Sequence, residues 1–173
     1  RGNGLAVTGF RGSQNQTIIF QNRSGNTPVV EVADDSFCNS STEEAILTEG
    51  IASIGRNAFS GCDKLHQVVL PISIEEINDS AFENCRNLKS VSLPGALKTI
   101  GNAAFKGTGL RTIAIPESVF WIGNGVVADC QLLEHVTIPS NMDKIPEHMF
   151  EGCINLKKVE LHERLNEIGE RAF

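Results

Sequence analysis

Residues 54–77 read IGRNAFSGCDKLHQVVLPISIEEI, and the pattern of this stretch returns along the chain. Isoleucine recurs every 22 or 23 residues, at positions 54, 77, 100, 122, 145 and 168. A fixed period of this length is typical of repeat architectures, in which each repeat contacts only its neighbours. The chain is therefore expected to fold as a solenoid.

Other apolar positions keep the same phase as the isoleucines. Five residues after them come Phe59, Phe82, Phe105, Val127, Phe150 and Phe173, followed by Cys62, Cys85, Thr108, Cys130 and Cys153, and then by Leu65, Leu88, Leu110, Leu133 and Leu156. Stacked repeats would align each set as a column through the core.

Each leucine opens a stretch of the form L-x-x-V-x-L, such as LHQVVL at 65–70. Apolar and polar residues alternate there, and a proline follows in four of five repeats. Alternation with β-branched residues predicts one short strand per repeat, and the proline ends it. Equivalent strands would stack about 4.8 Å apart as one parallel sheet.

The segment I-G-x-x-A-F-x-G-C lies between the strands. Its apolar side chains stand at i, i+4, i+5 and i+8, with a glycine near the end, as at Gly61. This spacing predicts a short helix or helical turn on the face opposite the sheet. The expected fold class is therefore α/β, a solenoid with one parallel β-sheet and short helical turns.

The periodicity indicates a single domain over 1–173. Residues 54–173 form the regular repeats, the last of them incomplete, and residues 1–53 read as an N-terminal cap and a divergent repeat, with strands expected in LAVTGF (5–10) and TIIF (17–20). An incomplete last repeat would expose core residues. We expect that the natural chain continues past Phe173, or that this end meets another chain, including a second copy.

Charge and hydropathy exclude two classes of partner. The chain of 173 residues has 15 Lys and Arg against 21 Asp and Glu, a net charge of −6, and contains no basic run. A general binder of nucleic acid is not expected. No apolar stretch approaches the roughly 18 residues that a membrane span needs, so membrane insertion is not expected either.

The repeat pattern, continued through P-x-x-[IL]-x-x-I, resembles the BspA-like leucine-rich repeats. The resemblance is close over 54–173, and TPVVEVADDSF (27–37) resembles the start of such arrays. It implies a right-handed solenoid on the surface of a bacterium, or secreted by it, and some family members are adhesins for host matrix and plasma proteins. The departures are Val127 for Phe, Thr108 for Cys, Asn78 and Pro146 for Gly, and His162 for Pro.

No catalytic, metal or cofactor site is expected. Four of the five cysteines recur at the repeat period, which predicts a buried column of thiols, whereas Cys38 lies off that column. His66 and His135 would lie on outward strand positions three repeats apart, about 14 Å, which is too far to share a metal.

The outward positions of L-x-x-V-x-L form a candidate contact surface. One column reads His66, Lys89, Arg111, Glu134 and Lys157, and Lys158 belongs to the next column. A mildly basic surface of this kind suits an acidic patch on a protein or glycan. The alternative is an ordinary solvated face, with Glu134 relieving the repulsion between its cationic neighbours.

Phe120 and Trp121 are the second candidate. The corresponding pairs in the other repeats are polar, for example Glu75 and Glu76, and Trp121 is the single tryptophan of a chain without tyrosine. Tryptophan is enriched at binding hot spots. The alternative is that one ring folds inward to fill the space left by Val127.

These features together predict a non-enzymatic recognition or adhesion module for a protein or glycan, at the cell surface or secreted. The candidate contact residues are Phe120, Trp121, Lys89, Arg111, Lys157 and Lys158. Two alternatives stay open. The array is a structural spacer in a larger surface protein, or it is an accessory region that presents substrate to an enzyme.

Overall fold

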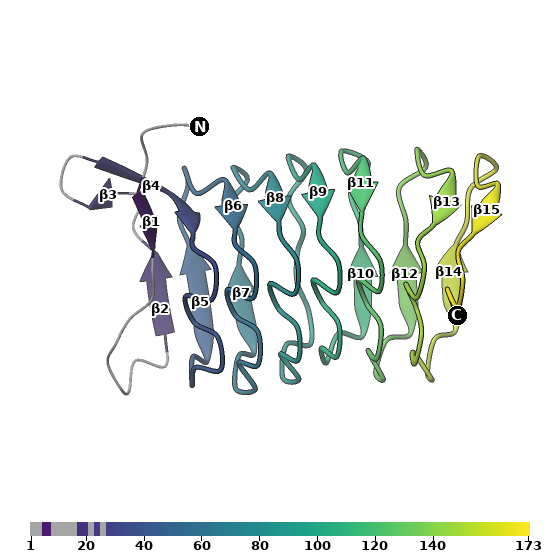
Figure 1. The fold of residues 1–173 in the computed structure, drawn as a ribbon, viewed down its shortest axis with the longest axis horizontal. Coiled ribbons are helices and arrows are strands. Elements are labelled where there is room, and N and C mark those ends of the chain that lie inside the picture. Colours follow the sequence, from purple (N-terminus) through teal and green to yellow (C-terminus); the bar gives the residue numbers. More distant parts are fainter. Residues whose placement is uncertain (1–4, 8–16, 21–22, 25–26) are drawn as a thin grey trace.

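The structure is a computed structural model that describes residues 5–7, 17–20, 23–24 and 27–173. The chain winds into a coil whose successive turns, here called rungs, stack along one axis (Figure 1). Each regular rung runs along two faces, on which the strand arrows point in opposite directions. The predicted solenoid is therefore confirmed, and the division at residue 53 stays a prediction.

From Glu44 onward the two faces differ in the length of their strands, with three or four residues on one face and two on the other. The long-strand face consists of β2 (Thr17–Phe20), β5 (Glu44–Leu47), β7 (Gln67–Val69), β10 (Thr112–Ala114), β12 (His135–Thr137) and β14 (Lys158–Glu160). The short-strand face consists of β1 (Leu5–Val7), β4 (Thr27–Val32), β6 (Ser53–Ile54), β8 (Glu76–Ile77), β9 (Thr99–Ile100), β11 (Trp121–Ile122), β13 (Lys144–Ile145) and β15 (Glu167–Ile168).

Neighbouring rungs pair in parallel, in the register that the repeat imposes. Thr112 lies opposite His135, and His135 lies opposite Lys158. Among the described strands, only β3 (Arg23–Ser24) pairs antiparallel, with β4. The expectation of one parallel sheet is wrong, because a second ladder, whose strands have two residues each from β6 onward, runs along the opposite side of the coil.

Each ladder is interrupted once. On the long-strand face, residues 88–93 form no strand, which separates β2-β5-β7 from β10-β12-β14. On the short-strand face, β11 does not pair with β13. The predicted strand in LHQVVL is confirmed as β7, whereas the one in LKSVSL (88–93) is wrong.

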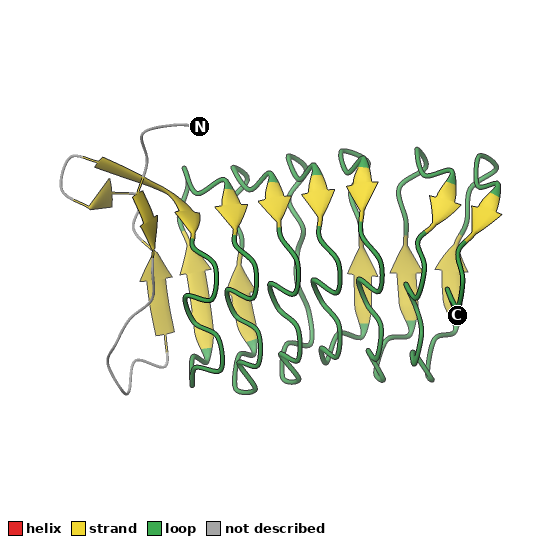
Figure 2. Cartoon of the chain, in the orientation of Figure 1, coloured by secondary structure: helices red, strands yellow, loops and turns green. Residues whose placement is uncertain are grey.

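The predicted helical turns are also wrong, since the described residues contain no helix (Figure 2). A helix would need N–H groups bonded four residues back. The N–H groups of Asn57, Phe59 and Gly61 donate instead to carbonyls of the next rung, at 2.7–3.0 Å. Asn57 (φ 53°) and Gly61 (φ 71°) also adopt the left-handed conformation, four residues apart. The segment is thus a series of tight turns, which points its apolar side chains toward the core without forming a helix.

The core lies between the two faces. Phe37, Phe59, Phe82 and Phe105 stack with ring centroids 5.3–5.4 Å apart and planes within 11° of parallel. The stack stops at Val127 and resumes with Phe150 and Phe173. Because this column of rings crosses the rungs, it joins repeats that could not bury their apolar side chains alone.

The cysteine column is buried as predicted. Cys62, Cys85, Cys130 and Cys153 are free thiols in the core, and Cys38 is half-buried. Each of the four buried thiols donates to a backbone carbonyl of the preceding rung, at 2.9–3.1 Å. Ser40 and Thr108 continue the column with hydroxyl groups, 3.3 Å from Cys62 and 3.2 Å from Cys130. The thiols therefore have a packing and hydrogen-bonding role.

Candidate functional site

Phe120 and Trp121 both face solvent on the short-strand face. Their exposed fractions are 71% and 47%. Trp121 begins β11 and lies opposite Thr99 of β9, so the indole occupies a place that is polar in the neighbouring rung. The alternative in which one ring folds inward is excluded, and the two rings form an exposed aromatic pair.

The space left by Val127 is filled by other side chains. The residue directly before the column phenylalanine is alanine at 58, 81, 104 and 172. In the rungs of Val127 and Phe150 the preceding residue is Val126 and Met149 instead. Val126, Val127 and Met149 are all fully buried. Met is flexible enough to fill irregular gaps in a core. The core at this rung is therefore packed without a contribution from either ring of the aromatic pair.

A hollow of about 360 Å³ opens beside the aromatic pair, where β11 and β13 fail to pair. Phe120, Trp121, Asn141, Asp143 and Pro146 are among its lining residues. The hollow thus combines two aromatic rings with polar side chains.

Pro146 accounts for one of the hydrogen bonds that the ladder lacks at this point. In neighbouring rungs the residue at its position donates a backbone N–H to an isoleucine carbonyl of the preceding rung, as Gly123 does to Ile100 (2.9 Å) and Gly169 does to Ile145 (2.9 Å). Proline has no N–H, so the Ile122 carbonyl lacks this donor. The repeat therefore leaves an open acceptor next to the aromatic pair.

The basic candidates lie on the long-strand face. Arg111 and Lys157 both pair with Glu134, the former at 3.5 Å, which confirms that Glu134 separates these two cations. The hydrogen bond from Lys157, together with the charges of Lys157 and Arg111, lowers the pKa of Glu134. Lys158 pairs with Glu160 at 2.8 Å. Of the four cations, only Lys89 has no ion pair among the described residues.

The six candidate contact residues are therefore not gathered in one site. Phe120 and Trp121 belong to the ladder of β11, whereas Arg111, Lys157 and Lys158 lie along β10 and β14. Phe120 and Trp121 line the hollow beside β11, and none of Lys89, Arg111, Lys157 and Lys158 lines it.

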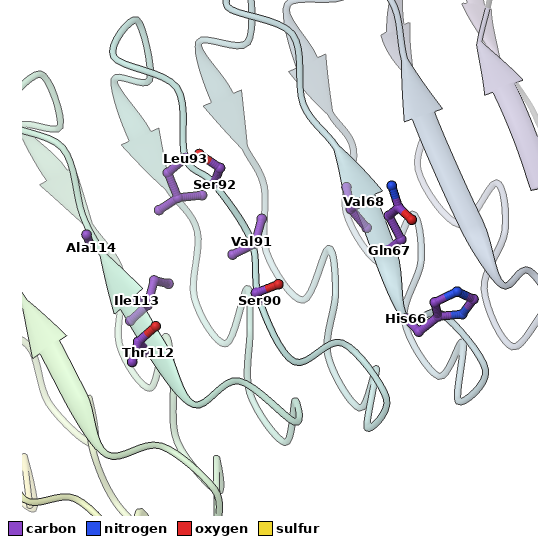
Figure 3. Close-up of a pocket in the computed structure, with 10 residues that line it drawn as sticks. All are labelled: His66, Gln67, Val68, Ser90, Val91, Ser92, Leu93, Thr112, Ile113 and Ala114. Atoms are coloured by element: carbon purple, nitrogen blue, oxygen red, sulfur yellow. The ribbon is translucent and has the colours of Figure 1, made fainter.

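A second hollow, of about 610 Å³, lies on the long-strand face, where residues 88–93 form no strand. Figure 3 shows His66, Gln67 and Val68 on one side of it and Thr112, Ile113 and Ala114 on the other, with Ser90–Leu93 between them. The short side chains of the middle rung leave this space open. The sequence signal for it is weak, because Ser90 and Ser92 are ordinary residues for outward strand positions.

The described residues offer no metal site, since no three His, Cys, Asp or Glu side chains among them come together as ligands. His66 lies near Glu44 (3.6 Å) and His148 bonds Glu151 (2.7 Å), so each histidine has a single carboxylate neighbour in its ion pair. Burial raises the pKa of the core thiols, to about 12 for Cys153, so they are poor nucleophiles at neutral pH. Over the described part of the chain, the structure contains no helix long and apolar enough to cross a membrane.

Comparison with known proteins explains the architecture. The family model for the BspA type leucine-rich repeat region matches six copies, over residues 30–131 and 75–173. The chain belongs to the BspA-type leucine-rich repeat family. The resemblance drawn from the sequence is thereby confirmed.

Solved structures agree with this membership of the BspA-type family. The leucine-rich repeat protein TpLRR of T. pallidum is 31% identical with a TM-score of 0.85, over 96% of this chain and 74% of that one. A leucine-rich repeat protein of Bacteroides ovatus is 32% identical with a TM-score of 0.92, over 99% of this chain and 46% of that one. The chain thus spans less than half of the second protein. A leucine-rich cell surface protein of Faecalibacterium prausnitzii, 20% identical with a TM-score of 0.53 over 99% of this chain and 69% of that one, shares the fold. No curated protein matches the chain.

Proposed function

We propose that the chain is a non-enzymatic recognition module, secreted or displayed at a cell surface, that binds a protein or glycan through the aromatic pair Phe120–Trp121. Membership of the leucine-rich repeat family supports a role in protein interaction. The observation that carries the proposal is the exposure of two large aromatic side chains where neighbouring rungs are polar. Exposed aromatics next to a concave surface are typical of binding sites.

The basic candidates take a lesser part in this proposal. Arg111, Lys157 and Lys158 are already paired with carboxylates, so an acidic partner would have to displace Glu134 or Glu160. Exposed ion pairs are worth little to stability, and this exchange would gain little affinity. Lys89 is the cation that an acidic group can reach without such an exchange. Self-association through residues 161–173 stays a prediction, with Ile168 and Phe173 exposed there.

The proposal is tested by measuring the binding of the purified chain to a panel of extracellular matrix proteins and glycans. Replacing both aromatic residues, Phe120→Ala with Trp121→Ala, is expected to weaken binding at least about 30-fold, because removal of a hot-spot residue costs about 2 kcal/mol or more. Circular dichroism checks that the variant keeps its fold.

The matched control is the double variant Lys157→Ala with Lys158→Ala, on the other face. Loss of binding in the aromatic variant alone supports the proposal. Loss in the lysine variant alone would move the contact surface to the long-strand face. If the parent chain binds no member of the panel, the structural spacer becomes the better account of its role. A catalytic domain found elsewhere in the natural protein would favour the accessory role instead.

A further inference from the structure

We propose that the ligand at this site is a neutral oligosaccharide, with a sugar ring stacked on the indole of Trp121. This inference rests on the proposed recognition function and names its ligand class. It joins three observations: the exposed aromatic pair, a set of open hydrogen-bond acceptors beside it, and two hollows that meet at Trp121.

The aromatic pair supplies a flat apolar platform. Phe120 and Trp121 are exposed and line the same hollow of about 360 Å³. One face of a pyranose ring presents C–H groups, which pack on an aromatic face, and the hydroxyls around its rim stay free to hydrogen-bond. Small-ligand sites commonly pair such apolar walls with a few placed polar groups, in volumes from about 300 Å³ upward.

The polar groups around the platform are mostly acceptors. The Ile122 carbonyl lacks its usual donor because Pro146 has no N–H. The Asp143 carboxylate has no hydrogen bond or ion pair with the described residues. The amide of Asn141 donates to the carbonyls of Glu117 (3.3 Å) and Val119 (3.2 Å), which fixes the side chain and leaves its oxygen as an acceptor. Hydroxyl groups are the donors that suit this arrangement.

The charge around the hollow favours a neutral ligand. Lys144 lines the hollow, but its ammonium group lies 2.7 Å from the Glu167 carboxylate. Asp143 contributes a negative charge that Lys144 therefore does not cancel. A carboxylate or phosphate would be repelled, whereas a neutral polyhydroxyl ligand can donate to Asp143 without that penalty.

Trp121 also forms the boundary of another hollow. This one has a volume of about 250 Å³ and is lined by Thr99, Asp79 and Arg56 as well as the indole. The indole therefore stands between two hollows along the short-strand face. A chain of sugar rings can follow this direction, so a trisaccharide is expected to bind more tightly than a single sugar.

The chain carries its own probe for this experiment. Trp121 is its single tryptophan and there is no tyrosine, so intrinsic fluorescence reports on this site alone. The purified chain is titrated with methyl glycosides of glucose, galactose, mannose and N-acetylglucosamine, and with a trisaccharide of each sugar. We expect a saturable change in Trp121 emission for at least one series, with tighter binding of the trisaccharide.

Two variants retain the tryptophan and test the geometry. Phe120→Ala and Asp143→Asn are each expected to weaken the binding of that trisaccharide about tenfold, which corresponds to the loss of one good contact. Ile154→Ala, at an exposed residue that lines neither hollow, is expected to leave it unchanged. Circular dichroism confirms the fold of each variant.

The outcomes separate this inference from the function on which it rests. Sugar binding that both variants leave unchanged would overturn the inference, because the sugar would then bind elsewhere. A chain that binds a protein of the matrix panel through Phe120 and Trp121 but no sugar would also overturn it, while the recognition function would stand. A chain that binds neither would remove both.

Discussion

Raising the pH from 8.5 to 10 is expected to cost the folded chain several kcal/mol, because four thiols stay protonated only in the core. Burial raises the pKa of Cys62, Cys85 and Cys130, and it raises that of Cys153 to about 12. An unfolded thiol titrates near 8.5. Above that pH the unfolded chain loses protons that the folded chain keeps, so stability is complete below about pH 8.5 and falls as the pH rises.

The size of this effect follows from proton counting. Each thiol contributes a slope of about 1.4 kcal/mol per pH unit between its unfolded and folded pKa, which is about 5.5 kcal/mol per unit where all four stay protonated in the folded chain. Urea unfolding followed by circular dichroism between pH 7 and 10.3 measures the slope. A matched variant separates the contribution of the thiols from that of the lysines, which titrate near pH 10.4.

Cys85→Ser is the matched variant for this prediction. Serine does not titrate in this range, and Ser40 and Thr108 already show that a hydroxyl fits the column. The variant should reduce the alkaline slope by about a quarter. A parent chain whose stability is flat to pH 10.3, or a slope that Cys85→Ser leaves unchanged, would refute the assignment.

Gly101→Ala is expected to destabilise the fold by about 3 kcal/mol or more. A Cβ at this position would lie 2.4 Å from the backbone nitrogen of Asp79 and 2.5 Å from the carbonyl carbon of Asn78, both in the preceding rung. Relief requires the rungs to separate, which stretches the hydrogen bond from the Gly101 N–H to Ile77 (2.7 Å). Denaturant unfolding of the variant and the parent measures the difference.

Gly95→Ala is the control, since an added Cβ there has no atom within 4 Å. It should be neutral or stabilise the chain by up to about 1 kcal/mol, because alanine restricts the unfolded chain more than glycine does. Equal effects at Gly95 and Gly101 would show that close contact between rungs is not what requires glycine at position 101.

The close approach of neighbouring rungs at the glycine position also accounts for Asn78, which departs from the repeat pattern. Side-chain oxygens of Asp34, Asp79 and Asn102 each accept an N–H from the next rung, at 2.6–2.9 Å. Each also lies within 2.8 Å of where a Cβ would stand on the facing glycine, at 55, 101 and 123. Arg56 replaces the Asp or Asn in one rung, and the next rung then has Asn78 in place of glycine. At positions 55, 101 and 123, glycine thus leaves room for an Asp or Asn side chain that folds over the next rung.

Much of this architecture was predictable because the repeat period fixes which residues stack. The columns of phenylalanine and cysteine, the strand of L-x-x-V-x-L and the place of Glu134 between two cations all follow from it. The polar counterparts Glu75 and Glu76 favoured exposure of Phe120 and Trp121, but Val127 left open an inward ring, and only the structure decided between the two.

The turns were not predictable from the same pattern. Apolar spacing shows which side chains point inward, but a helix and a series of turns can place Ile54, Ala58 and Phe59 alike. The choice is made by hydrogen bonds to the next rung and by left-handed residues such as Ala103 (φ 52°), which no sequence signal marks. The signal for the hollow was present in Pro146, because proline removes a donor that the repeat otherwise uses.

The central claim is that Phe120 and Trp121 form the contact surface. Hydroxyl-radical footprinting of the ligand-bound chain is the most direct test of this claim. Exposed aromatic side chains react readily, and oxidation is read residue by residue by mass spectrometry. We expect the bound ligand to lower the oxidation of Phe120 and Trp121 and to leave exposed Ile154 unchanged. Unchanged oxidation of both aromatics, with protection confined to the long-strand face, would contradict the account.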